Sequence, residues 1–104
     1  MQLIPDNNQE LNLKTSQGKR LLKIALENVK LADEKQQDYG PNNILYSGEM
    51  GIAVRCQDKI CRLKHLLEKD GKINHESLED TYRDLANYAM IGLLLHRGQW
   101  VDKK

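Results

Sequence analysis

The chain has 104 residues, of which 39% are hydrophobic and 30% charged, and its formal net charge is +1. Its length fits a single domain, and a domain this small gains stability when a partner subunit covers its apolar surface, so we expect a homo-oligomer. The nearly neutral charge gives no overall attraction for nucleic acid, so DNA binding is not expected and any anion site must be local.

No stretch reaches the roughly 18 apolar residues that a membrane span requires. The first residues, MQLIPDNN, also lack the basic segment and long apolar core of a secretory signal. We therefore expect a cytoplasmic protein without a membrane partner. The scarcity of proline and the long helical patterns predict an all-α fold, a small bundle of three main antiparallel helices completed by oligomerisation.

Residues 1–15 are polar and weakly patterned, and we expect an N-terminal arm there, followed by a single all-α domain of residues 16–104. Apolar residues at spacings of three and four predict a first helix from about Ser16 to near Asp38. The helix should end there because Gly40 and Pro41 do not continue a helix. The apolar stripe of this helix consists of Leu22, Ala25, Leu26, Val29 and Ala32.

The next segment, Pro41 to Tyr46, is predicted as a loop, with Ser47 capping a second helix that stops near Asp70 and Gly71. Its apolar stripe is formed by Ile52, Cys56, Ile60, Leu63 and Leu67. Its other face carries a group of charged residues, Arg55, Asp58, Lys59 and Arg62. Their spacings predict a surface ladder of ion pairs. The two cysteines, Cys56 and Cys61, are predicted to be small buried side chains rather than a disulfide or a metal site.

The third helix should run from about Glu76 to Gly98 and become apolar on nearly all sides from Leu85 to Leu95. Three polar residues stand in this mostly apolar helix at positions i, i+4 and i+7, which lie on one helical face. They are Asp80, Asp84 and Asn87. The start of the helix is predicted at Asn74 or Ser77, because Ser77 followed by Asp80 resembles a capping box, which partly explains the position of Asp80. A carboxylate within the apolar half needs a cation, a donor or a metal, because burial without a partner costs several kcal/mol.

A short turn between the second and third helices predicts antiparallel packing, which can bring their polar faces together as a seam inside the bundle. Arginines there can bind phosphate, and aspartates with an asparagine offer the oxygen ligands that Mg²⁺ prefers. A nucleotide with its metal would use both. The alternative is that Arg55 or Arg62 simply neutralises Asp84 in a structural network without a ligand.

Three segments, DYGPNNI, GEMGIAVRCQDKICRLKHLL and ESLEDTYRDLANYAMIGLLLHRG, closely resemble the nucleotide modification associated domain 1 family of small bacteriophage and bacterial proteins. The resemblance covers roughly residues 38–98 and implies a link to nucleotide metabolism. The positions that match the family's polar motif are Arg55, Asp58, Lys59, Arg62, Glu79, Asp80, Asp84 and Asn87, and Tyr39 and Gly40 match the segment before it.

A more distant likeness is to the all-α nucleoside triphosphate pyrophosphatases, which hold Mg²⁺ with acidic pairs on two antiparallel helices. The chain departs from that pattern, because Arg55-x-x-Asp58 and Thr81 stand where acidic pairs are usual. The sequence therefore offers fewer carboxylates than Mg²⁺-dependent hydrolysis normally uses. Glycine-rich phosphate loops and histidine spacings for zinc are also missing from the sequence.

Three functions stay open. The first is a nucleotide-binding protein of phage origin that recognises or sequesters a nucleotide or a nucleotide-derived signal. Its predicted ligand contacts are Arg55, Lys59, Arg62, Asn87 and Tyr39. The second is a Mg²⁺-dependent pyrophosphatase whose predicted metal ligands are Asp58, Asp80 and Asp84, with Glu49 or Glu79 supplying a further ligand or the general base. The third is a helical interaction module without a ligand.

Overall fold

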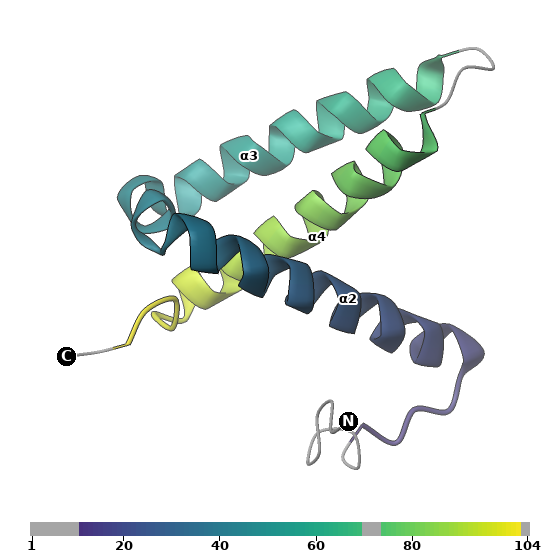
Figure 1. Cartoon of the computed structure of the whole chain (residues 1–104), viewed down its shortest axis with the longest axis horizontal. Coiled ribbons are helices and arrows are strands. Elements are labelled where there is room, and N and C mark those ends of the chain that lie inside the picture. The colour runs from purple at the N-terminus through teal and green to yellow at the C-terminus, as the bar shows by residue number, and fades with distance from the viewer. Residues whose placement is uncertain (1–10, 70–73, 103–104) are drawn as a thin grey trace.

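The computed structural model describes residues 11–69 and 74–102, which form three long helices and contain no strand. The helices are α2 (Ser16–Tyr39), α3 (Asn42–Glu68) and α4 (His75–His96). α3 and α4 form an antiparallel hairpin, and α2 crosses it over the later part of α4 (Figure 1). The predicted all-α bundle is confirmed. Most of the predicted N-terminal arm, and the turn at Asp70 and Gly71, lie outside the described residues.

α2 has the boundaries that the sequence predicts. The Thr15 side chain caps its start, because Oγ1 accepts a hydrogen bond from the Gly18 amide at 2.9 Å. The helix ends at Gly40, whose φ of 72° lies in the left-handed region that favours glycine. The packing of α2 is unexpected, because Asn28 is the one buried residue among the 24 residues of this helix. Within one chain the predicted apolar stripe is only partly covered, since Val29 is exposed and the other four stripe residues are half-buried.

The start of α3 differs from the prediction. Residues 42–46 of the loop that was expected at 41–46 are helical, and the chain changes direction at Gly48, which has φ 64° and ψ −158°. The predicted cap at Ser47 is wrong, since its hydroxyl donates to the Asn43 carbonyl oxygen within the preceding turn. Burial of Ile44, which is only 3% exposed, explains why this segment is helical. The helical turn directs the Ile44 side chain into the core, and Gly48 then changes the direction of the helix.

The core between α3 and α4 is small. Ile44, Ile52 and Ile91 form its buried centre, and Cys56, Tyr88, Leu95 and Trp100 pack against it. The two helices approach closely at Gly92, where a Cβ would lie 3.1 Å from Cγ2 of Ile52. The cysteine prediction holds in part, because Cys56 is half-buried and free whereas Cys61 is free but exposed.

α4 is less buried than its sequence predicts. The expectation of burial on nearly all sides from Leu85 to Leu95 is wrong for a single chain, since Met90, Leu93 and Leu94 are exposed. The helix begins after Asn74, whose Oδ1 accepts a hydrogen bond from the Ser77 amide at 3.0 Å. Of the two predicted starts, Asn74 is confirmed and Ser77 is not the cap. The apolar half of α4 thus forms a surface as well as a core.

Candidate functional site

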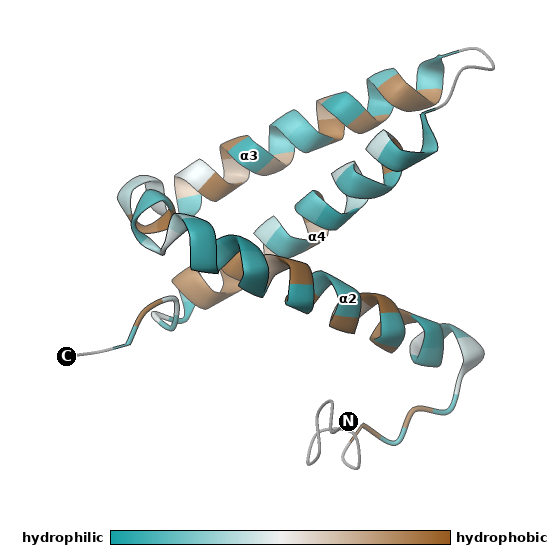
Figure 2. Cartoon of the chain, in the orientation of Figure 1, coloured by the Kyte–Doolittle hydropathy of each residue, from teal (hydrophilic) through white to brown (hydrophobic). Residues whose placement is uncertain are grey.

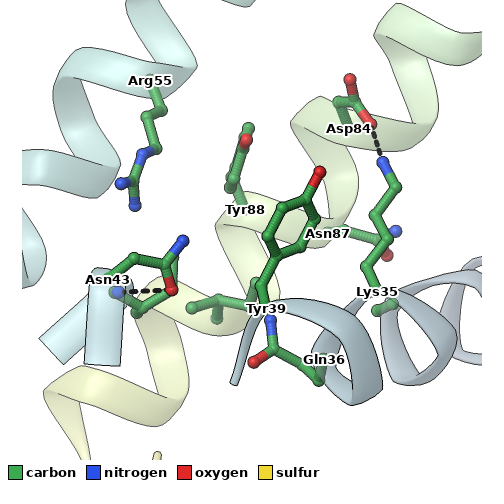
Figure 3. A pocket seen from close by; sticks show the side chains of 11 residues that line it. Lys35, Gln36, Tyr39, Asn43, Arg55, Asp84, Asn87 and Tyr88 are labelled. Carbon is green, nitrogen blue, oxygen red and sulfur yellow. Dashed lines mark hydrogen bonds and ion pairs between the residues drawn. The ribbon is translucent and has the colours of Figure 1, made fainter. Parts of the chain in front are cut away.

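A cavity of about 260 Å³ opens where the end of α2, the first half of α3 and the middle of α4 meet. Polar side chains from all three helices surround it, as Figure 3 shows. They are Lys35, Gln36 and Tyr39 from α2, Asn43 and Arg55 from α3, and Asp84, Asn87 and Tyr88 from α4. The floor is apolar, because Ile44 and Ile91 of the core line the same cavity.

Arg55 supplies an unpaired cation. Its Nη1 is buried and has no hydrogen-bond partner in the structure. Its guanidinium carbon lies 5.9 Å from the centroid of the Tyr88 ring, a cation–π contact that orients the side chain without satisfying its N–H groups. A buried N–H without an acceptor costs about 1–3 kcal/mol, and more for a charged group. The cavity therefore contains a fixed donor that lacks an acceptor.

Asn87 supplies the complementary group. It is 6% exposed, and its Oδ1 is buried without a hydrogen-bond donor. Arg55 and Asn87 come from facing helices and line the same cavity (Figure 3). Buried polar atoms in native proteins are nearly always satisfied, so an unpaired donor and an unpaired acceptor in one cavity are typical of a ligand site.

Asp84 is held by two lysines. Its Oδ2 lies 2.9 Å from Nζ of Lys59, and its Oδ1 lies 3.2 Å from Nζ of Lys35. Burial alone raises the pKa of the Asp84 carboxyl, but the hydrogen bonds and charges of Lys59 and Lys35 outweigh it, so its pKa lies below the ordinary 3.8. At neutral pH the carboxylate is charged, and with Lys35, Lys59 and Arg55 it leaves the site with an excess of positive charge.

The comparisons with known proteins show one family. The family model for nucleotide modification associated domain 1 matches residues 35–95, more than half of the chain. The chain belongs to this family. The matched region begins at Lys35 and includes every polar residue that lines the cavity. Neither a curated protein nor a solved structure matches the chain. Within the described ranges, no helix of this family member is long and apolar enough to cross a membrane.

The structure separates the predicted site residues of this nucleotide modification associated domain into two groups. Tyr39, Arg55, Asp84 and Asn87 line the cavity, and Lys59 joins them through its ion pair with Asp84. The other three, Arg62, Asp58 and Asp80, are exposed and do not line it. The predicted ladder of Arg55, Asp58 and Arg62 is wrong, because the described residues contain no ion pair among them.

The predicted magnesium ligands do not converge within one chain. Asp58 and Asp80 are exposed, and Asp84 is occupied by lysines rather than by further carboxylates. In residues 11–69 and 74–102 no group of three or more His, Cys, Asp or Glu side chains is placed to hold a metal ion. The alternative prediction, that arginine neutralises Asp84, is wrong in its residue, since lysines take that role.

Four polar residues of the cavity were not predicted from the sequence. They are Lys35, Gln36, Asn43 and Tyr88. Lys35 stands one helical turn before Tyr39, so the spacing of these two residues was the available signal for a shared face of α2. This spacing indicates a site only once α2 is known to cross α4. Asn43 was not predicted because it lies in the segment that was expected to be a loop.

Proposed function

We propose that this protein binds a phosphorylated nucleotide, or a small molecule derived from one, in the cavity between α2, α3 and α4. The observation that carries the proposal is the pair of buried unpartnered atoms, Nη1 of Arg55 and Oδ1 of Asn87. A ligand that satisfies both must present an acceptor to the arginine and a donor to the asparagine. A nucleotide has both groups, because its phosphate oxygens accept and the amino or imino groups of its base donate.

The charges of the site favour a phosphate over a neutral acceptor. Among the described residues Arg55 has no carboxylate partner, and the two lysines share the single carboxylate of Asp84. A guanidinium offers paired N–H donors that match phosphate oxygens. We therefore expect the phosphate to lie near Arg55. Lys35 and Lys59 lie close to the same cavity, so all three cations should attract the phosphate at long range.

The aromatic side chains suit the base. Tyr39 and Tyr88 line the cavity from different helices, and Figure 3 shows both among the side chains that surround it. Tyr39 is 71% exposed, so its ring is accessible to a ligand that enters the cavity. Stacking of a base on an aromatic side chain contributes about 1–3 kcal/mol. The volume of about 260 Å³ lies just below the range of about 300–1,000 Å³ for small-molecule sites, which favours a ligand no larger than a mononucleotide.

The arrangement supports binding better than hydrolysis. A Mg²⁺-dependent pyrophosphatase needs several carboxylates around the metal and its water. Here Asp84 is the one carboxylate that lines the cavity, and two ammonium groups hold it. Mg²⁺ bound with the nucleotide, like the proposed phage origin and the recognition or sequestering role, stays a prediction. The name of the family supports the nucleotide but specifies neither the base nor the reaction.

Two arginines of α3 provide a matched test. Both were predicted to bind the nucleotide, but Arg55 lines the cavity with a buried Nη1, whereas Arg62 is exposed. Isothermal titration of the purified protein with a panel of ribo- and deoxyribonucleoside mono-, di- and triphosphates, with and without Mg²⁺, identifies the ligand. We expect Arg55→Gln to weaken binding by about 10- to 100-fold, the range of a charged hydrogen bond of 1.5–3 kcal/mol, and Arg62→Gln to leave it unchanged.

Mass spectrometry of the same incubations distinguishes the three functions. Unaltered nucleotide recovered after denaturation supports a binding protein, whereas a monophosphate with released pyrophosphate identifies a hydrolase. Equal loss of affinity in Arg55→Gln and Arg62→Gln would place the ligand outside the cavity. No binding of any nucleotide by a folded wild-type protein would contradict the proposal and leave the helical interaction module as the function.

A further inference from the structure

α2 is a long helix with too little to pack against in its own chain. Of its 24 residues only Asn28 is buried, and its first half extends beyond the α3–α4 hairpin (Figure 1). Most helical stability in proteins comes from packing of an apolar face rather than from helix propensity. Leu21 and Ile24 in the projecting half are 65% and 49% exposed, so such a face exists and lacks a partner within the chain.

The apolar surface continues from α2 onto α4. A groove lined by Val29, Ala32, Met90, Ile91, Leu94 and Trp100 runs between the two helices. Val29, Met90 and Leu94 are all exposed, and apolar positions lie along α2 in Figure 2. We call the surface formed by this groove together with Leu21 and Ile24 the α2–α4 face. Exposed apolar surface of this extent marks a protein interface.

The chain as a whole exposes more surface than a compact protein of its mass. The chain exposes 8489 Å², whereas a compact protein of 12.0 kDa exposes roughly 6,000 Å². Its radius of gyration of 15.8 Å also exceeds the roughly 13 Å of a compact chain of this length. A standard interface covers about 800 Å² on each partner. The excess surface is larger than that.

The charges of α2 identify the occupant as a second copy of the chain. Its first half, residues 16–27, carries three cations against Glu27, and its second half, residues 28–39, carries three carboxylates against two lysines. The cations of the first half are Lys19, Arg20 and Lys23, and the carboxylates of the second half are Asp33, Glu34 and Asp38. Two such helices in antiparallel orientation place each basic half beside an acidic half. This is the self-complementary arrangement that a twofold interface requires.

We propose that the protein is a homodimer in which two α2 helices pack antiparallel, so that the projecting half of each lies on the α2–α4 face of the other. The proposal is independent of the ligand. It has a consequence for the cavity, however, because Ala32, Gln36, Asn87 and Ile91 line both the groove and the candidate nucleotide site. The second copy therefore covers one wall of that site.

Two valines with matching exposure test the interface by light scattering coupled to size exclusion. Val29 on α2 is 53% exposed and Val54 on α3 is 50% exposed, and only Val29 lies on the α2–α4 face. We expect wild type and Val54→Glu to have twice the 12.0 kDa mass of the chain, and Val29→Glu and Leu21→Glu to be folded monomers by circular dichroism. A monomeric wild type, or dissociation by Val54→Glu alone, would overturn the proposal.

A charge exchange tests the antiparallel orientation and excludes nonspecific association. One variant carries K19E, R20E and K23E, and the other carries D33K, E34K and D38K. Each should be monomeric alone, because like charges then meet along the interface, and an equimolar mixture should form a heterodimer. Failure of the mixture to associate would refute antiparallel pairing even if the wild type is a dimer. Since mass is measured without nucleotide, the result is separate from the outcome of the ligand titrations.

Discussion

Asn28 connects α2 to the α3–α4 hairpin through a buried hydrogen bond. Removing its side chain should therefore lower the free energy of unfolding by more than the small size of the side chain suggests. Its Oδ1 accepts a hydrogen bond from Nη1 of Arg83 on α4 at 3.0 Å, and the residue is 5% exposed. The same arginine uses Nη2 to bind Oε1 of Glu27 at 3.0 Å. Asn28 and Glu27 are therefore neighbouring partners of one guanidinium, one buried and one on the surface.

The magnitude follows from this difference in burial. A hydrogen bond to a charged group contributes about 1.5–3 kcal/mol, and the 28% exposure of the Arg83 side chain places this bond near the lower end of that range. We therefore expect Asn28→Ala to lower the free energy of unfolding by about 2 kcal/mol, which for a domain of this size lowers Tm by roughly 8–16 °C. Glu27→Ala removes a surface ion pair and should cost less than about 1 kcal/mol.

Urea unfolding followed by circular dichroism, at one fixed protein concentration, measures both variants under the same conditions. The fixed concentration matters because association contributes to the apparent stability of a dimer. If Glu27→Ala costs as much as Asn28→Ala, or if Asn28→Ala is neutral, the buried hydrogen bond does not hold α2 in place and the reasoning is refuted.

Two further changes test the backbone and the electrostatics. Gly48→Ala should destabilise the protein by about 1–3 kcal/mol in urea unfolding, because φ 64° with ψ −158° is a conformation that only glycine adopts readily; a neutral result would contradict the break in α3. Asp84→Asn should be destabilising at neutral pH. Since the pKa of Asp84 is lower in the folded state than its ordinary 3.8, the difference in unfolding free energy from wild type should persist above that value and disappear as the pH falls through the folded pKa. A difference that grows on acidification would show that Lys35 and Lys59 do not stabilise the carboxylate.

Much of the fold could be predicted because it depends on local signals. The ends of α2 follow from Thr15 as a cap and from Gly40, and the end of α4 follows from Gly98 with its φ of 67°. The start of α3 could not be predicted in this way. Asn43 and Ser47 are typical of turns, and only the burial of Ile44 explains why residues 42–47 are helical.

The candidate site was predicted in part, because helical spacing determines which side chains share a face. Helical spacing placed Asp84 and Asn87 on one face of α4 and Arg55 on the facing side of α3, and these residues line one cavity. Spacing also grouped Arg62 with them, although it is exposed. A repeat of 3.6 residues per turn fixes the angle of a side chain around its own helix, but it does not fix how far along that helix the neighbouring helix extends.

The sequence by itself determined the helices, their antiparallel hairpin and the residue types of the site, because caps, apolar periodicity and turn residues act over a few positions. The tertiary structure decided which charges meet. Lys35 is 49 positions from Asp84 in the sequence and reaches it only because α2 crosses α4. That crossing is set by packing between distant segments rather than by any local pattern. The tertiary structure also decided that, among the described residues, buried atoms of Arg55 and Asn87 have no hydrogen-bond partner and that Leu21 and Ile24 of α2 are exposed.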